Sequence, residues 1–115
     1  MTSPITTHVL DTMQGKPAAG VPIALDHLDA SGVWVELARG VTDSDGRIRD
    51  LLPGGRFLSA GTYRMNFETA SYFEASGVKG FYPSVPVIFE LQQPGEHYHI
   101  PLLLSPYGYS TYRGS

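Results

Sequence analysis

The chain has 115 residues, of which 42% are hydrophobic and 17% charged, a composition typical of one globular domain and not of a disordered segment. The net charge of -3 and the pI near 5.7 give no electrostatic footprint for nucleic acid or an anionic membrane surface. There are no cysteines, which excludes a disulfide framework and thiolate metal ligands.

Thirteen glycines and nine prolines divide the chain into short segments, and this punctuation favours strands joined by tight turns. The first predicted strand covers residues 5–11. Residues 21–29 and 33–42 follow as the two strands of a hairpin, with "SG" between them. The sequence "DSDGR" (residues 43–47) then predicts a turn, because Asp-Gly favours positive φ.

The second half of the chain continues in the same manner. A strand is predicted over residues 61–69, and residues 70–77 are the one stretch with helical character, closed by a glycine. Strands over residues 85–93, 97–105 and 107–115 complete the series. About eight strands and one short helix predict an all-β fold, an antiparallel β-sandwich of two sheets that takes up the chain as a single domain.

The first residues, "MTSPITTHVLD", lack the basic and apolar regions of a secretory signal. No apolar run approaches the ~20 residues that a transmembrane helix requires. We therefore expect a cytoplasmic protein that does not associate with a membrane.

The segment "HYHIPLLLS" carries two of the four histidines. Alternate residues of a strand face opposite sides, so one face is predicted to be the core face, with Tyr98, Ile100, Leu102 and Leu104. The opposite face carries His97 and His99 together with Leu103. An apolar residue among them indicates that this face is covered by something other than water, such as another subunit.

Three interpretations of the histidines remain open from the pattern. They can be surface or hydrogen-bonded structural residues, which is the interpretation favoured for His27. His97-x-His99 can form part of a zinc site with His8 as third ligand, although no carboxylate or cysteine ligand is evident. They can also serve as general acids and bases, because imidazole titrates near neutral pH.

Arg47 and the chain end are similarly ambiguous. At the end of a turn, Arg47 can be a solvated residue, or its guanidinium can clamp a planar, carbonyl-rich or anionic ligand. Tyr112 and Arg113 can simply be an exposed strand end. The chain has no nucleophile elbow, phosphate-binding glycine loop or cysteine nucleophile.

Four segments of the chain resemble the 5-hydroxyisourate hydrolases, the transthyretin-related enzymes of urate catabolism. They are "THVLDTMQGKPAAGVPIAL", "TDSDGR", "FYPSVPVIFEL" and, above all, "HYHIPLLLSPYGYSTYRGS". The match covers residues 5–115, and the ending Tyr-Arg-Gly-Ser distinguishes these hydrolases from transthyretin itself, the hormone carrier that shares the fold.

The resemblance implies a transthyretin-like sandwich assembled as a homotetramer, a dimer of dimers with active sites at the dimer–dimer interface. The implied catalytic residues are His8, Arg47 and His99. The implied substrate contacts are His8, Arg47, Tyr112, Gly114 and Ser115. The resemblance implies neither a cofactor nor a metal, and the only partners are 5-hydroxyisourate and further copies of the chain.

The reaction implied is hydrolytic opening of the lactam of 5-hydroxyisourate to 2-oxo-4-hydroxy-4-carboxy-5-ureidoimidazoline. We expect His8 and His99 to activate the attacking water, and Arg47 to stabilise negative charge on the carbonyl and to lower the pKa of nearby imidazoles. Two alternatives are a transthyretin-like carrier of a small apolar ligand in the same inter-dimer channel and a non-catalytic β-sandwich interaction module. The polarity of the site discriminates between the enzyme and the carrier.

Overall fold

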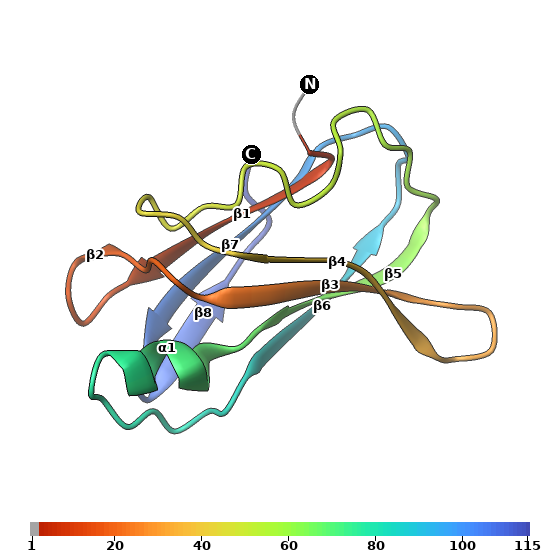
Figure 1. The fold of residues 1–115 in the computed structure, drawn as a ribbon. Helices are drawn as coiled ribbons and strands as arrows, with labels where there is room; N and C mark the ends of the chain where they lie inside the picture. The colour runs from red at the N-terminus through yellow and green to blue at the C-terminus, as the bar shows by residue number, and fades with distance from the viewer. Residues whose placement is uncertain (1–2) are drawn as a thin grey trace.

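Two four-stranded sheets face each other in the structure, a computed structural model that describes residues 3–115 (Figure 1). In spatial order, the first sheet consists of β2 (Lys16–Pro17), β1 (Ile5–Asp11), β7 (Tyr98–Ser105) and β8 (Gly108–Thr111). The second sheet consists of β4 (Trp34–Val41), β3 (Pro22–Leu28), β5 (Gly61–Phe67) and β6 (Val85–Leu91). The β-sandwich predicted from the pattern is therefore confirmed.

One strand pair departs from the antiparallel arrangement predicted for the sandwich. β1 and β7 run parallel, with Thr6 opposite His99 and His8 opposite Pro101, whereas the other strand pairs of the described residues are antiparallel. A parallel partner requires a long crossover, and here most of the chain lies between the two strands. The last strand also ends earlier than predicted, at Thr111, so the final residues are not part of the ladder.

The core lies between the two sheets. From β7 it receives the four residues predicted from the alternation, Tyr98, Ile100, Leu102 and Leu104. β5 contributes Tyr63, Met65 and Phe67, and β1 contributes Ile5 and Val9. Burying such side chains stabilises the fold by about 1.5–3 kcal/mol each. The residues between them on β1 and β7 consequently face away from the core, which is where the histidines are.

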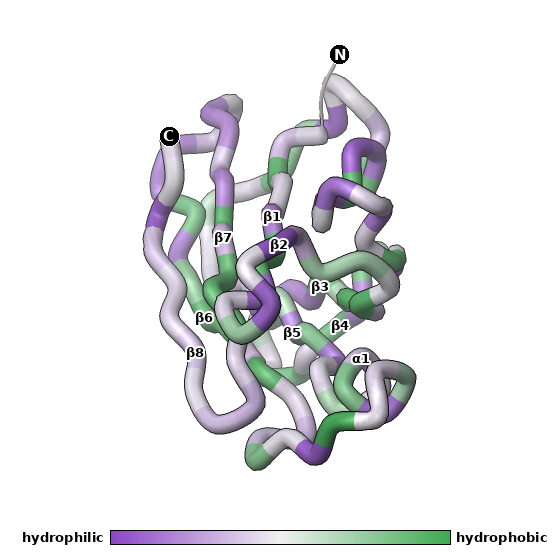
Figure 2. Tube along the Cα trace, turned by 90° about the vertical axis from the view of Figure 1, so that its left-hand side faces the viewer, coloured by the Kyte–Doolittle hydropathy of each residue, from purple (hydrophilic) through white to green (hydrophobic). Residues whose placement is uncertain are grey.

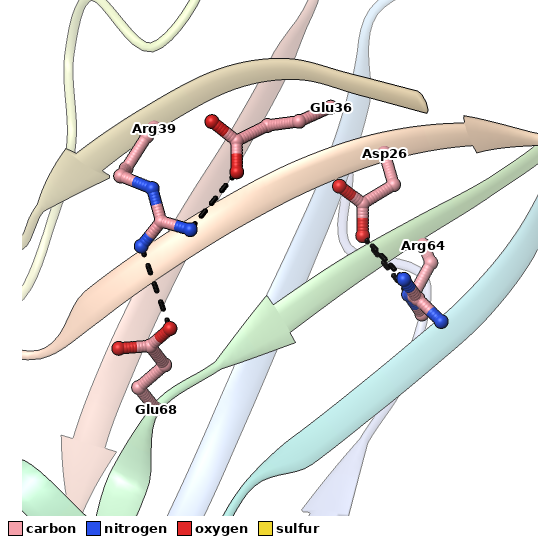
Figure 3. A network of polar contacts seen from close by, with 5 residues as sticks. All are labelled: Asp26, Glu36, Arg39, Arg64 and Glu68. Atoms are coloured by element: carbon pink, nitrogen blue, oxygen red, sulfur yellow. Dashed lines mark hydrogen bonds and ion pairs between the residues drawn. The ribbon is translucent and has the colours of Figure 1, made fainter. Parts of the chain in front are cut away.

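The outer face of the second sheet is covered by ion pairs (Figure 3). Arg64 donates to Asp26 through Nε and Nη2 at 3.0 and 2.8 Å. Arg39 contacts Glu36 at 2.9 Å and Glu68 at 3.4 Å, and these three side chains are about half exposed. The Asp26–Arg64 pair joins the adjacent strands β3 and β5 and is largely buried, whereas Arg39 and Glu36 both lie on β4 and, like Glu68, are solvated.

Helix α1 (Thr69–Ala75) lies at one end of the sandwich (Figure 1). As predicted, a glycine closes it: Gly77, two residues beyond the last helical residue, has a φ of 71°. The Gly77 N–H donates to the Glu74 carbonyl at 3.0 Å and the Val78 N–H to the Phe73 carbonyl at 2.9 Å, the hydrogen-bond pattern of a Schellman motif. Among residues 3–115, no helix has the length and apolar character needed to cross a membrane.

Candidate active site

The parallel pairing of β1 with β7 places the histidines of the two strands on one face of the sheet. His99 is directly opposite Thr6, and His8 lies two residues further along β1 on the same face. Both imidazoles are half-buried. In Figure 2, β7 changes from hydrophilic at its start to hydrophobic further on, and the C-terminus lies beside its hydrophilic end. His99 is the second residue of this strand.

Arg47 reaches this face because the turn after β4 is attached to β1. His8 and Arg47 form an isolated antiparallel bridge, and the Val9 N–H donates to the Gly46 carbonyl at 2.8 Å. The turn is closed internally by Asp43, whose carboxylate accepts from the Arg47 N–H at 3.1 Å and whose own N–H donates to the Arg47 carbonyl at 2.8 Å. The turn predicted from "DSDGR" therefore fixes the Arg47 backbone next to His8.

Gly46 allows this close attachment. Its φ is +76°, and a Cβ at this position would lie 2.4 Å from the Val9 carbonyl oxygen. A side chain would thus be strained by its backbone conformation and would also overlap β1. A glycine at residue 46 is what lets the Arg47 turn dock on the strand that carries His8.

The end of the chain lies alongside β7, in the register of the β7–β8 pairing. The Gly114 N–H donates to the His99 carbonyl at 2.8 Å, and the two residues form an isolated bridge. Arg113 anchors this segment, because its guanidinium pairs with Glu96 at 3.1 Å and lies 4.5 Å from the ring centroid of Tyr98. The chain's own end therefore packs against His99, and the cover of this face by another subunit stays a prediction.

A hollow of about 270 Å³ opens between these segments. Its walls come from β1, from the turn after β4, from the start of β7 and from the chain end, and they comprise Thr6, Thr7, Arg47, Ile48, Arg49, His97, His99 and Ser115. Seven of these eight residues carry an arginine, histidine or hydroxyl group. A small polar molecule rich in hydrogen-bonding groups matches such a wall.

The electrostatics of the hollow keep His99 neutral at pH 7. Burial of the imidazole lowers the pKa of His99 below its ordinary value, and the positive charge of Arg47, followed by His97 and His8, lowers this pKa further. A neutral imidazole has a free lone pair and accepts a proton. Arg47 acts in the direction predicted from the sequence, although burial makes the larger contribution.

The structure brings most of the predicted site residues together. Arg47, His99 and Ser115 line the hollow, Gly114 packs on His99, and His8 joins them through its bridge to Arg47. Tyr112 lies elsewhere in this single chain: it is 59% exposed and lines a second hollow of about 420 Å³, between β6 and the chain end. Its ring is thus not placed beside His99 of its own chain.

Four residues of the hollow were not singled out in the sequence interpretation: Thr6, Thr7, Ile48 and Arg49. Thr6 Oγ1 lies 2.9 Å from Nδ1 of His99 and 2.9 Å from Nε2 of His97. Arg49 lines the same hollow while it pairs with Asp45 at 3.1 Å. Strand alternation was the available signal for Thr6, which precedes His8 by two residues on β1, whereas Arg49 lies in a turn, where alternation gives no signal.

The zinc interpretation of His97-x-His99 requires a third ligand. Within residues 3–115, no group of three or more His, Cys, Asp or Glu side chains lies close enough together to hold a metal ion. His97 and His99 instead share the hydroxyl of Thr6.

Comparisons with known proteins place the chain among relatives with this fold. The HIUase/Transthyretin family model matches residues 5–114. The chain is 48% identical over 111 residues to the 5-hydroxyisourate hydrolase of Salmonella dublin, across 96% of this chain and 80% of that protein.

Two solved structures show the same fold. Sea bream transthyretin in complex with thyroxine superposes with a TM-score of 0.91 at 34% identity, over 97% of this chain and 95% of that one. Klebsiella pneumoniae 5-hydroxyisourate hydrolase superposes with a TM-score of 0.84 at 34% identity, over 96% of this chain and 97% of that one. Because both a transthyretin and a hydrolase match, the fold alone does not separate their activities, and the residues of the hollow must decide.

Proposed function

The chain belongs to the HIUase/transthyretin family, and from this premise we propose that it is a 5-hydroxyisourate hydrolase of urate catabolism. The reaction opens the lactam of the substrate with water and yields 2-oxo-4-hydroxy-4-carboxy-5-ureidoimidazoline. One observation carries the proposal: Arg47 and His99, from two separate segments of the chain, line one polar hollow, and a backbone bridge to Arg47 holds His8 of β1 beside it.

The carrier alternative fits this hollow less well. A carrier of an apolar aromatic molecule requires a predominantly apolar lining. Here Arg47, Arg49, His97 and His99 contribute to the wall, and such groups suit a planar heterocycle dense in carbonyl and N–H groups.

In the proposed mechanism, water is the nucleophile and no covalent intermediate forms. His99 is neutral at pH 7, and its Nε2 takes a proton from the water as the oxygen attacks the lactam carbonyl. His8 helps to bind that water. Arg47 donates to the carbonyl oxygen and stabilises its developing negative charge. When the C–N bond breaks, an imidazolium returns a proton to the leaving ring nitrogen.

The chain end contributes to the wall of the site in this proposal. Ser115 offers polar contacts, and Gly114, which has no Cβ, allows the backbone of the chain end to approach His99 closely. We propose that the active unit is a homotetramer, a dimer of dimers with sites at the dimer–dimer interface. In this tetramer, Tyr112 contacts the substrate through its ring and hydroxyl. The half-buried Leu10 and Leu103, on the same face as the histidines, support cover by another subunit. The cytoplasmic location stays a prediction.

A coupled assay tests the proposal. Urate oxidase generates 5-hydroxyisourate from urate, and the decay of its absorbance is followed with and without the protein. We expect decay well above the uncatalysed rate, saturating with substrate. Decay at the uncatalysed rate, together with tight binding of an apolar aromatic ligand, would favour the carrier instead.

A further inference from the structure

The hydroxyl of Thr6 lies between two imidazoles that differ in their exposure to water. Thr6 Oγ1 is 2.9 Å from Nδ1 of His99, which is half-buried, and 2.9 Å from Nε2 of His97, which is exposed. The two rings are nearly parallel, at 20°, with centroids 6.5 Å apart. Nothing in the hydrolytic mechanism above uses this arrangement.

A threonine hydroxyl has one proton, and this limits how it can satisfy both rings. If it donates to Nε2 of His97, it must accept from an N–H at Nδ1 of His99. His99 then has its lone pair on Nε2, the nitrogen that a general base needs for the water. If the direction is reversed, Thr6 donates to Nδ1 of His99 and Nε2 of His99 carries the proton that a general acid needs.

We propose that Thr6 is a positioning residue for His99 and forms, with His97, a proton relay that carries charge from His99 to solvent-exposed His97. The proposal rests on the hydrolase function proposed above and extends it to residues that do not attack or bind the reacting atoms.

The protons balance along this path. As water attacks, one of its O–H bonds breaks and an N–H bond forms at Nε2 of His99. The Nδ1 proton of His99 moves to Thr6 Oγ1, and the original hydroxyl proton of Thr6 moves to Nε2 of His97. Thr6 and His99 are then neutral and His97 carries the positive charge. The reverse sequence delivers a proton from Nε2 of His99 to the leaving ring nitrogen.

The charge distribution around the two rings gives this path its advantage. His99 faces His8 on β1, Arg47 and Arg49 from the turn after β4, and His97 on its own segment. An imidazolium at His99 would be a second positive charge beside Arg47 in a partly buried site. His97 instead is exposed, so water solvates the charge, and it also lines a neighbouring hollow together with Arg56 and Glu96.

Four variants test the relay in the coupled assay. Thr6→Val keeps a β-branched side chain but removes the hydroxyl, and we expect kcat to fall by about 10²-fold with little change in KM. Thr6→Ser restores the hydroxyl and most of the rate. His97→Gln still accepts a hydrogen bond from Thr6 but takes no proton, so kcat should fall similarly. Thr62→Val on β5 is the matched control and should retain wild-type kcat.

A second measurement does not depend on activity. Long-range ¹H–¹⁵N NMR spectra of the imidazoles report the tautomer of His99, and we expect Nδ1–H in the wild type and in His97→Gln, but not in Thr6→Val. Should Thr6→Val not fold by circular dichroism, His97→Gln, whose position is exposed, carries the kinetic test.

Wild-type kcat in both Thr6→Val and His97→Gln, an equal loss in Thr6→Ser and Thr6→Val, or an Nε2–H tautomer of His99 in the wild type would each overturn the relay while leaving the hydrolase intact. An inactive wild type would instead overturn the proposed function. The His99 tautomer measured by NMR would then still test whether Thr6 accepts a hydrogen bond from Nδ1 of His99.

Discussion

Gly114 lies so close to His99 that a Cβ at residue 114 would stand 2.5 Å from Cδ2 of the imidazole. This Cβ would also lie 3.2 Å from Cγ of Pro101. We therefore expect Gly114→Ala to push the chain end away from β7 or to turn the His99 ring. Either change displaces the proposed base, since a misplacement of about 1 Å can cost 10²-fold in rate. The coupled 5-hydroxyisourate assay measures the loss.

A matched substitution separates this effect from a general cost of replacing glycine. At Gly108 a Cβ would meet Ser105 Oγ at 3.8 Å, an ordinary van der Waals distance. Gly108→Ala should therefore retain activity, and both variants should unfold near the wild-type urea concentration. If Gly114→Ala is as active as Gly108→Ala, the close packing of Gly114 on His99 does not matter for catalysis.

The sequence pattern predicted the faces of β7 correctly, because alternation depends only on which residues are apolar. Tyr98, Ile100, Leu102 and Leu104 are buried as predicted. The resemblance to the hydrolases, carried by four quoted segments, is confirmed as family membership. Both predictions used local sequence information. The faces of β7 follow from the two-residue period of a strand, and the family resemblance follows from short motifs.

The parallel neighbour of β7 and the role of Thr6 were not predictable in this way. Thr6 and His99 are 93 positions apart, and only the tertiary pairing of β1 with β7 places them opposite each other. For Tyr112, the strand pattern predicted regular structure that is not present. Continuing the strand pattern to the chain end gave it a regular place, but the ladder stops at Thr111, and Tyr112 lines the hollow beside β6.

Tyr72→Phe should lower stability without affecting the site. The buried hydroxyl of Tyr72, whose pKa is raised by burial and by Asp11, donates to Asp11 Oδ2 at 2.6 Å. Asp11 is fully buried and keeps three other donors, from Met13 and Gln14. Losing one hydrogen bond to a charged acceptor costs about 1.5–3 kcal/mol. Urea denaturation at one fixed protein concentration measures the change.

The control for that variant is Tyr107→Phe, because Tyr107 is 73% exposed and its hydroxyl faces water. Its free energy of unfolding should match that of the wild type, and kcat should be unchanged in both variants. Equal stability of Tyr72→Phe and Tyr107→Phe would show that the Asp11 contact does not contribute to folding.

His8→Asn and His99→Asn should each reduce kcat by about 10²–10⁴-fold, the usual contribution of general acid–base catalysis. Asparagine keeps a polar side chain of similar reach but does not exchange protons near pH 7. His27→Asn is the control, since His27 lies on β3 of the other sheet and packs against Tyr63, with the ring centroids 4.7 Å apart and the rings tilted by 31°. Wild-type turnover in His8→Asn and His99→Asn would contradict the assignment of the base.

Arg47→Gln tests the electrostatic part of the site through the titration of His99. The guanidinium disfavours the imidazolium, so its removal should raise the pKa of His99 toward its ordinary value of about 6.5. Burial is the larger cause of the lowered pKa and persists in the variant, so we expect a partial return. The neutral fraction of His99 at pH 6 then decreases. The chemical shift of the His99 Cε1 proton, followed from pH 4 to pH 8, reports this midpoint without reference to activity.

The same variant also loses the donor to the substrate carbonyl, so kcat alone would not isolate the electrostatic effect. Arg49→Gln provides the comparison: Arg49 lines the hollow, but it is exposed and pairs with Asp45 and Asp43, so its charge is compensated and screened by water. The His99 midpoint should move less in Arg49→Gln than in Arg47→Gln. An equal shift in the two variants would mean that the pKa of His99 depends on the overall charge of the turn and not on Arg47 in particular. A midpoint that stays constant or falls in Arg47→Gln would show that Arg47 does not lower the pKa of His99.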